Sequence, residues 1–365
     1  MPDRPQRLAE RRVAITSVVR YARATEVSGC LRVLDLDKGR LSFVTPSPES
    51  TFREADPNPR GGTRGTRGLS VHGDRIVVAN AERLFVFDTA WALVAELSNE
   101  LMADVHDVLA EERGIWVAAT GIDQLLLVGW DGTLLHAWTF RKDRRLLQEL
   151  GFGGRSLPHA DPITDLRDPR ERNSGYDRLH LNSLGRGRDG ILLSFGRVRP
   201  SEETGSKMSS ALVRATDNGS GNPHLDVLHR QAGVKLPSHN VAEDGDLLVY
   251  NDSSRHRLVA WDTVRGEPRC EVPIPGSPPY ARGLARIGDD LWLVGSQAPL
   301  SVHAVDVRCG EVVASYPLAG IQDEVVFGIC ALPEAFADPR QPLGDDPYEF
   351  WRLAALGVTI APKRG

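Results

Sequence analysis

The chain has 365 residues, of which 41% are hydrophobic and 25% charged, and this composition is that of a globular protein with a substantial core. A net charge of −5 gives no electrostatic reason to expect a nucleic-acid partner or an anionic membrane surface. No segment approaches about 18 consecutive apolar residues, and the first residues contain no apolar stretch of signal-peptide type, so we expect a cytoplasmic protein with no membrane partner.

The first patterned segment, residues 12–46, predicts three strands in "RVAITSVV", "CLRVLDLD" and "LSFVTP". A unit of about 40 residues then repeats, with five copies that start near residues 67, 106, 180, 239 and 282. The clearest copy is "HDVLAEERGIWVAATGIDQLLLVGWDGTLLHAWTF", which contains four short strand-like runs and an Asp-Gly hairpin turn. Four short strands in each repeat of about 40 residues are typical of a β-propeller blade.

One strand, "VVFGICAL" at residues 325–332, remains after the fifth copy. Together with the three strands at the start it completes a sixth blade, which removes the unpaired edges of an open ring. We therefore predict an all-β, six-bladed β-propeller that occupies residues 1–332 as a single domain. The predicted blades are 12–46 with 325–332, 67–99, 105–141, 179–230, 238–273 and 281–318.

Two stretches do not follow the repeat. Residues 142–178 begin with a helical pattern and become rich in loop-forming residues, which predicts a lid-like insertion across one face of the propeller. Residues 333–365 contain "DPYEFWRLAALGV", which predicts a short C-terminal helix packed on the outside.

A polar or aromatic residue stands near the start of the first strand of every predicted blade. Because the first strand of a propeller blade lines the central channel, we expect these residues to lie at one height around an axial pocket. The spacing from the five His and Arg residues to the first apolar residue of the next strand is 9, 9, 11, 8 and 9 residues, which supports this alignment. The six aligned residues are Arg67, His106, His180, His239, Arg282 and Phe327.

Three histidines that converge on one axis support two kinds of chemistry. In the first, His106, His180 and His239 bind a divalent transition metal such as zinc, iron or copper, and leave positions open for water or substrate. In the second, no metal is present, and one of these histidines is the nucleophile or general base. In both, Arg67 and Arg282 bind an anionic group of the substrate.

Further residues are expected at the mouth of this pocket. Asn182 lies two residues after His180 in the same strand and therefore points to the same side, toward the substrate. Phe327 closes the ring, and His159 and Tyr176 of the insertion descend over the mouth. The expected substrate is a small polar or anionic molecule or a short peptide.

The sequence also bears on other functions. A Rossmann fingerprint, a P-loop and a GxSxG motif are absent, so we expect no nucleotide cofactor and no serine-hydrolase chemistry. The four cysteines have no CxxC spacing, which favours reduced thiols over a zinc or redox site. A propeller that only binds a partner remains a third possibility beside the two enzymatic ones.

The segment "LHLNSLGRGRDGILLSFGRV" at residues 179–198 is similar to a blade of the bacterial arylsulfate sulfotransferases. Those enzymes are six-bladed propellers in which one axial histidine is transiently sulfated. The resemblance implies His106, His180 or His239 as the sulfated residue and Arg282 as the residue that binds sulfate. The export signal and amino-terminal domain of those periplasmic enzymes do not occur in this sequence.

Three further segments resemble an uncharacterised bacterial propeller family of unassigned activity, which is related to those enzymes. They are "HLNSL", "LPSHNVAEDGDLLVYN" and "YARGLARIGDDLWLVGSQ", within residues 175–300. The amidating lyase propeller is similar only in geometry, because it uses three axial histidines to bind zinc.

Overall fold

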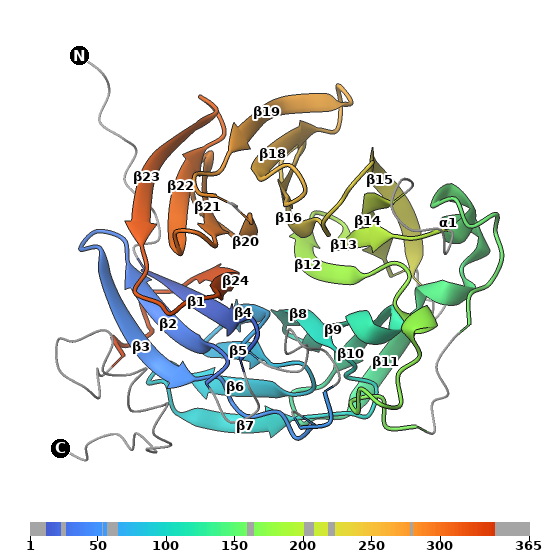
Figure 1. Ribbon diagram of the computed structural model, residues 1–365, viewed down its shortest axis with the longest axis horizontal. Helices are drawn as coiled ribbons and strands as arrows, with labels where there is room; N and C mark the ends of the chain where they lie inside the picture. Colours follow the sequence, from blue (N-terminus) through green and yellow to red (C-terminus); the bar gives the residue numbers. More distant parts are fainter. Residues whose placement is uncertain are drawn as a thin grey trace.

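Six four-stranded antiparallel sheets surround a central axis like the blades of a propeller (Figure 1). The computed structural model describes residues 12–22, 27–52, 54–56, 65–158, 164–200, 208–217, 223–277 and 280–339. The predicted six-bladed all-β propeller is confirmed. The predicted C-terminal helix lies outside the described residues.

Each blade has its innermost strand beside the axis and its outermost strand at the rim (Figure 1). From the axis outward, the first blade contains β24 (Glu324–Ala331), β1 (Arg12–Val19), β2 (Cys30–Asp35) and β3 (Arg40–Pro46). Blade two contains β4 (Leu69–His72), β5 (Arg75–Ala79), β6 (Leu84–Asp88) and β7 (Leu93–Leu97), and blade three contains β8 (Val105–Glu111), β9 (Gly114–Ala119), β10 (Gln124–Val128) and β11 (Leu134–Thr139).

The remaining blades follow the same order. Blade four contains β12 (Leu181–Gly187), β13 (Gly190–Val198), β14 (Ser209–Thr216) and β15 (His224–Ala232). Blade five contains β16 (His239–Asp244), β17 (Leu247–Asp252), β18 (Arg257–Asp262) and β19 (Glu267–Pro273). Blade six contains β20 (Arg282–Gly288), β21 (Leu291–Ser296), β22 (Ser301–Asp306) and β23 (Glu311–Pro317).

Both ends of the described chain close the first blade, as the sequence predicts. Strand β24 pairs antiparallel with β1, with Ile329 opposite Ile15. Arg32 of β2 and Glu324 of β24 form an ion pair whose side chains are both fully buried. Because this pair joins two strands from opposite ends of the sequence, it ties the ring together where it closes.

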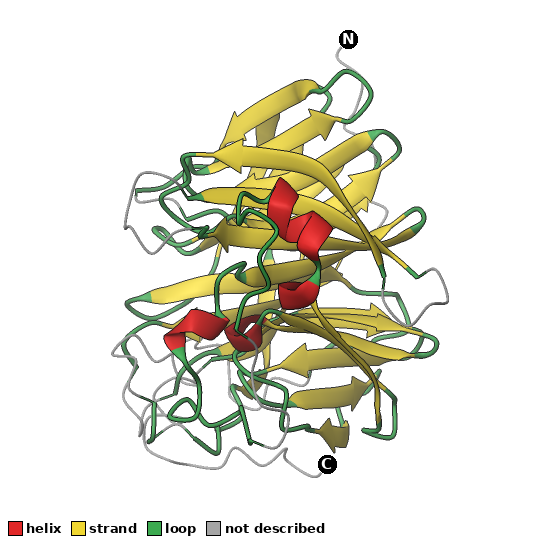
Figure 2. Cartoon of the chain, turned by 90° about the vertical axis from the view of Figure 1, so that its right-hand side faces the viewer, coloured by secondary structure: helices red, strands yellow, loops and turns green. Residues whose placement is uncertain are grey.

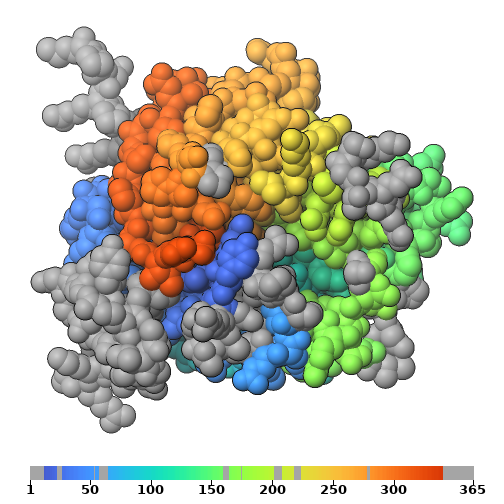
Figure 3. Space-filling model, viewed as in Figure 1, coloured from blue at the N-terminus to red at the C-terminus, as the bar shows by residue number. Residues whose placement is uncertain are grey.

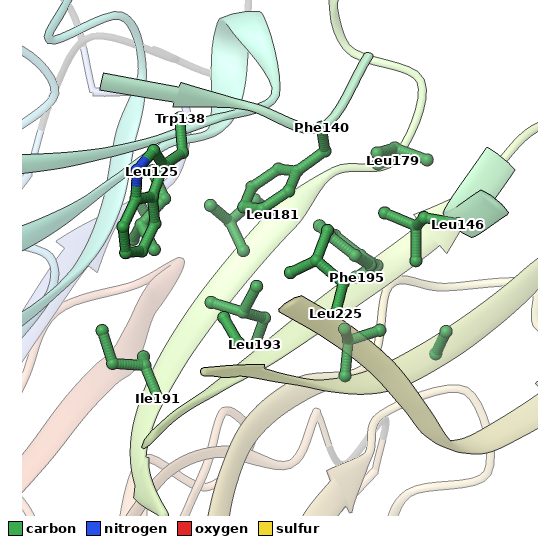
Figure 4. Close-up of a cluster of buried hydrophobic side chains, with 14 of the residues drawn as sticks. Leu125, Trp138, Phe140, Leu146, Leu179, Leu181, Ile191, Leu193, Phe195 and Leu225 are labelled. Carbon is green, nitrogen blue, oxygen red and sulfur yellow. The ribbon is translucent and has the colours of Figure 1, made fainter. Parts of the chain in front are cut away.

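Burial explains the layering of each blade. The middle strands β9 and β10 are buried at every position because neighbouring blades cover both of their faces, whereas the rim strand β23 alternates between exposed and partly buried residues. Figure 4 shows the apolar layer between blades three and four, where Leu125 and Trp138 face Leu193 and Phe195. A similar apolar layer, which includes Val249 and Val294, joins blades five and six, and these blades lie side by side on the face seen in Figure 3.

The few helices are short, and most lie in the connection between blades three and four (Figure 2). In that connection they are η2 (Phe140–Lys142), α1 (Arg144–Glu149) and η3 (Ser174–Tyr176), and a further short helix, η1 (Thr120–Ile122), joins β9 to β10 within blade three. Asp143 begins α1 by accepting a hydrogen bond from the Leu146 N–H at 2.9 Å, and the Leu146 and Leu147 side chains are buried in the apolar layer. No helix among the described residues is long and apolar enough to cross a membrane.

The described part of this insertion differs from the predicted lid. Helix α1 lies at the outer end of blade four, beside β15, and not over the axis (Figure 1). An ion pair between Arg145 and Asp226, at 3.7 Å, holds it there. Among its described residues, Asp177 at the end of the insertion contacts an axial residue, His180.

Candidate functional site

Side chains near the axis bind the backbone of the following blade, and these bonds fix the inner strands relative to one another. In each bond a side chain of one blade donates to a backbone carbonyl of the next. In order around the ring, the side-chain donor and the residue of the acceptor carbonyl are Thr16 and Arg67, Arg67 and Val105 (2.9 Å), Thr120 and Leu181, Asn182 and Ser238 (2.6 Å), and Ser253 and Ala281 (2.6 Å). Most of these groups are buried, where an unpaired carbonyl would be costly. The backbone that carries the axial residues is therefore held in place blade by blade.

The six aligned residues do not share one register, and in this respect the sequence alignment is wrong. His239 pairs with Asn251 and Arg282 with Gly295, and each pair precedes a one-residue bulge in the inner strand. His106 is itself the bulge residue of β8, and Phe327 is that of β24. A bulge adds one residue to an inner strand and redirects its side chain, so sequence spacing alone does not give its height along the axis.

His180 departs furthest from the alignment. It precedes β12, and its φ of 55° is in the left-handed region. The bulge residue of blade four is Asn182, which is therefore the structural equivalent of His106. The spacing of 11 residues in this blade, the longest of the five, was the sequence signal of this shift.

Despite the shifted registers, the predicted residues gather around Phe327. The His106 ring lies 5.1 Å from the His180 ring and 5.8 Å from the Phe327 ring, between centroids. The Arg282 guanidinium carbon lies 3.2 Å from the Phe327 ring centroid, and that of Arg67 lies 5.8 Å from it. Phe327 thus supplies an aromatic surface on which two arginines and a histidine converge.

His106 is a neutral imidazole with a defined tautomer. Its Nδ1 lies 2.7 Å from Asn182 Oδ1, and the Asn182 amide is oriented by its donation to the Ser238 carbonyl. A proton on Nδ1 satisfies the Asn182 oxygen, and Nε2 lies 3.5 Å from an Asp104 carboxylate oxygen, whose charge opposes the effect of burial on the pKa of His106. Burial lowers the pKa of His106 to about 4.

His239 has the same tautomer for a similar reason. The Ser253 hydroxyl donates to the Ala281 carbonyl and accepts from His239 Nδ1 at 2.7 Å. Tyr280 lies on the other side, with its hydroxyl 3.4 Å from His239 Nε2. Burial, together with the charge of Arg282, places the pKa of His239 well below its usual range.

His180 forms a dyad with a carboxylate. Its Nδ1 lies 3.0 Å from both oxygens of Asp177. Burial would raise the pKa of Asp177, but His180, Arg199 and Arg197 lower it further than burial raises it. An ionised Asp177 holds the Nδ1–H tautomer, which leaves Nε2 of His180 as the basic nitrogen.

The carboxylate of Asp123 sets the position of this dyad. Its oxygens accept hydrogen bonds from the backbone N–H groups of Arg178 (2.7 Å), Leu179 (2.9 Å) and His180 (2.9 Å). Arg141 forms an ion pair with it at 2.9 Å, and both side chains are fully buried. Burial, and then the charge of Asp177, raises the pKa of Asp123 to about 6.

Arg141 extends this support to the insertion. Its guanidinium donates to the backbone carbonyls of Pro158, Gly175 and Tyr176. Tyr176 itself packs against the apolar layer between blades two and three, with Arg141 above its ring at 5.9 Å. The described contacts of Tyr176 are thus with the wall of the propeller, and His159 lies outside the described residues.

The two axial arginines differ in their partners. Arg67 forms an ion pair with Asp104 at 2.7 Å. Arg282 is 7% exposed, yet its Nη2 has no hydrogen-bond partner among the described residues. Burial lowers the pKa of Arg282 to about 9. Asp107 exerts an opposing charge on Arg282, but burial raises the pKa of Asp107 to about 7, and its oxygens accept from the Val108 and Leu184 N–H groups.

The three histidines as placed do not form a metal site. Among the described residues, no group of three or more His, Cys, Asp or Glu side chains is arranged so that it could hold a metal ion. His106 and His180 are close to each other, whereas the ring neighbour of His239 is Tyr280, at 5.2 Å between centroids.

Structural comparison places the chain among known propellers. A structure titled as a nidogen/laminin complex matches at 12% identity over 88% of this chain and 98% of that chain, with a TM-score of 0.51. A Bacteroides caccae protein of unknown function matches at 8% identity over 89% and 100%, also with a TM-score of 0.51. The likeness is one of fold.

Two further matches have lower scores. Virginiamycin B lyase of Staphylococcus aureus matches at 11% identity over 85% of this chain and 90% of that chain, with a TM-score of 0.44. A streptogramin B lyase matches at 12% identity over 70% of this chain and 69% of that chain, with a TM-score of 0.41. No protein-family model matches the chain, and no curated protein does.

Several residues of this site were not singled out from the sequence. Asp177 lies in the insertion, where no repeat marks it, whereas Asp123 lies in the turn between β9 and β10 and Arg141 at the end of the third blade. Ser253 and Tyr280 lie in other elements than the histidine that they contact, His239. The signal available was Asp177 itself, an acidic residue three positions before His180.

Proposed function

We propose that this propeller is an enzyme that binds a small anionic substrate at the axis and uses His180 as its general base. The observation that carries the proposal is the Arg282 guanidinium, which is buried with Nη2 unpaired among the described residues. A buried cation without a partner is costly, and an anionic ligand removes that cost. The neutral His106 and His239 beside it add no positive charge of their own.

The dyad supports proton transfer from carbon. With a substrate carboxylate on Arg282, His180 Nε2 removes a proton from the adjacent carbon, and Asp177 stabilises the imidazolium that forms. Arg282 stabilises the negative charge that develops on the carboxylate. If the bond to a leaving group at the next carbon then breaks, a double bond forms and His180 returns the proton to that group. This is a lyase reaction without a metal.

A metal-dependent reaction is the second candidate. One observation favours it: in His106, His180 and His239 the Nδ1 atom faces an oxygen partner, so a proton on Nδ1 would leave Nε2 as the nitrogen that can bind a metal. That tautomer is the one in which imidazole Nε2 binds zinc, iron or copper. His239 would have to approach the other two rings for the three to share one ion.

Two other proposals stand on less. Sulfotransferase-like chemistry, suggested by residues 179–198, would use a bare imidazole Nε2 as the nucleophile, and Arg282 would bind the sulfate. A propeller that binds a ligand without catalysis would use the same arginine. Both predict anion binding, but only the first predicts a sulfated histidine.

The test combines binding, metal content and turnover. Calorimetric titration with small carboxylates and sulfate should show binding to the parent protein and none to Arg282→Gln, with the exposed Arg308→Gln as the matched control. His180→Gln should bind anions normally but should lose turnover, followed as the appearance of a conjugated double bond in a panel of 3-substituted carboxylates.

Each outcome decides between the candidates. Stoichiometric metal in the purified protein that is lost in a His106, His180 and His239→Ala triple variant would replace the first proposal with the second. A sulfated histidine after incubation with an aryl sulfate would favour the transferase. Anion binding without turnover, unchanged in His180→Gln, would leave a binding propeller.

A further inference from the structure

A third arginine, Arg20, belongs to the axial cluster. It directly follows β1, and its backbone N–H donates to the Asp323 carbonyl at 2.9 Å. Its guanidinium carbon lies 4.8 Å from the Tyr280 ring centroid. The Tyr280 hydroxyl in turn contacts His239. Arg20 therefore joins the axial residues from the first blade, through Tyr280 and His239.

The charges around the axis are unevenly compensated. Arg67 is paired with Asp104, and Arg199 lies 3.4 Å from Asp177. Within the described part of the chain, Arg20 and Arg282 stack on aromatic rings, and neither forms an ion pair with a carboxylate. Among the described residues, these two cations of the site therefore have no carboxylate partner.

These two cations influence each other. After burial, the charges of Arg20 and Arg67 contribute to the lowered pKa of Arg282, and the charge of Arg20 also acts on His239. Like charges in one poorly solvated site repel, and a ligand with two negative groups relieves this repulsion better than a ligand with one. Arg20 itself is only partly buried.

We propose that Arg20 and Arg282 form a two-point clamp for a dicarboxylate, which defines the substrate class of the site. This inference rests on the proposed function. One carboxylate binds at Arg282 beside the histidines, and the second binds at Arg20, whose guanidinium is oriented by stacking on Tyr280. The planar fork of each arginine matches the two oxygens of a carboxylate.

The test is a calorimetric comparison of malonate, succinate and glutarate with propionate, using the full chain. At least one dicarboxylate should bind the parent about tenfold or more tightly than propionate does. Arg20→Gln should bring the two affinities close together, and it should weaken binding of the dicarboxylate more than binding of propionate. Arg20→Lys should retain part of the preference, and Arg308→Gln should retain all of it. Thermal unfolding of each variant verifies that it is folded.

Failure of the clamp and failure of the anion site are distinguishable. Equal binding of dicarboxylates and propionate, dependent on Arg282, would overturn the clamp and leave the anion site standing. The same holds if Arg20→Gln keeps the full preference, or if inorganic sulfate binds more tightly than every dicarboxylate. Absence of binding by all these anions to the parent protein would overturn both.

Discussion

Replacing Arg282 with methionine should make the protein more stable while it abolishes anion binding. The lowering of the Arg282 pKa from 12.5 to about 9 corresponds to roughly 5 kcal/mol by which the buried site disfavours the charge. Stacking of the guanidinium on Phe327 stabilises the charged form and offsets about 2 kcal/mol of this cost. Methionine fills a similar volume without a charge, so we expect a gain of about 1–3 kcal/mol in the free energy of unfolding.

Urea unfolding followed by tryptophan fluorescence measures this gain. With a slope of about 3 kcal/mol per molar urea, the midpoint of Arg282→Met should rise by about 0.3–1 M at unchanged slope. Arg32→Met is the matched control, because Arg32 is equally buried but is paired with Glu324. Its loss leaves a buried carboxylate without its cation, so that midpoint should fall, by about 3–5 kcal/mol in free energy.

The opposite signs of these two substitutions are the essential result. A midpoint of Arg282→Met below that of the parent protein would refute the reasoning. It would mean that Arg282 stabilises the empty fold, and the axial cation could then no longer be explained as held at a cost for a ligand.

Three further predictions follow from the described contacts. The folded protein keeps His106 and His239 neutral, whereas the unfolded chain protonates them near pH 6.5. The free energy of unfolding should therefore rise with pH between about 4 and 6.5, by roughly 3 kcal/mol for His106 alone. Urea midpoints of His106→Gln across this range should show a weaker rise. The carboxylate of Asp123 accepts hydrogen bonds from the backbone N–H groups of Arg178 and His180, and Asp123→Asn replaces one accepting oxygen with an amide NH₂ group. The ¹⁵N signals of the His180 ring should therefore change even where the variant stays folded. Unchanged signals would argue against a positioning role for Asp123. Cys30 is fully buried, and burial raises the pKa of its thiol to about 12, so it should react with a thiol reagent only after unfolding; rapid labelling of the native protein would contradict this.

The general position of the site could be predicted from the sequence, but its internal chemistry could not. The repeat of about 40 residues indicates where each inner strand begins, and this was enough to bring Arg67, His106, His180 and Arg282 to one axis. Asn182, the partner of His106, could be named from the repeat, but other partners of the axial residues could not. Asp177, for example, lies at the end of an insertion that no other blade contains.

The sequence by itself determined the number of blades, their boundaries and the closure of the ring by both ends of the patterned chain. These features follow from hydrophobic periodicity and hairpin turns, which are local in the chain. Only the tertiary structure decided the register of the axial residues, the partners of each imidazole, and the contrast between Arg67, which is paired with Asp104, and Arg282, whose Nη2 has no partner among the described residues. One physical reason is that a one-residue bulge changes the direction of a side chain without changing the pattern of apolar residues. The other is that the hydrogen-bond and charge partners of the axial residues lie on other elements, which come close only when the ring closes.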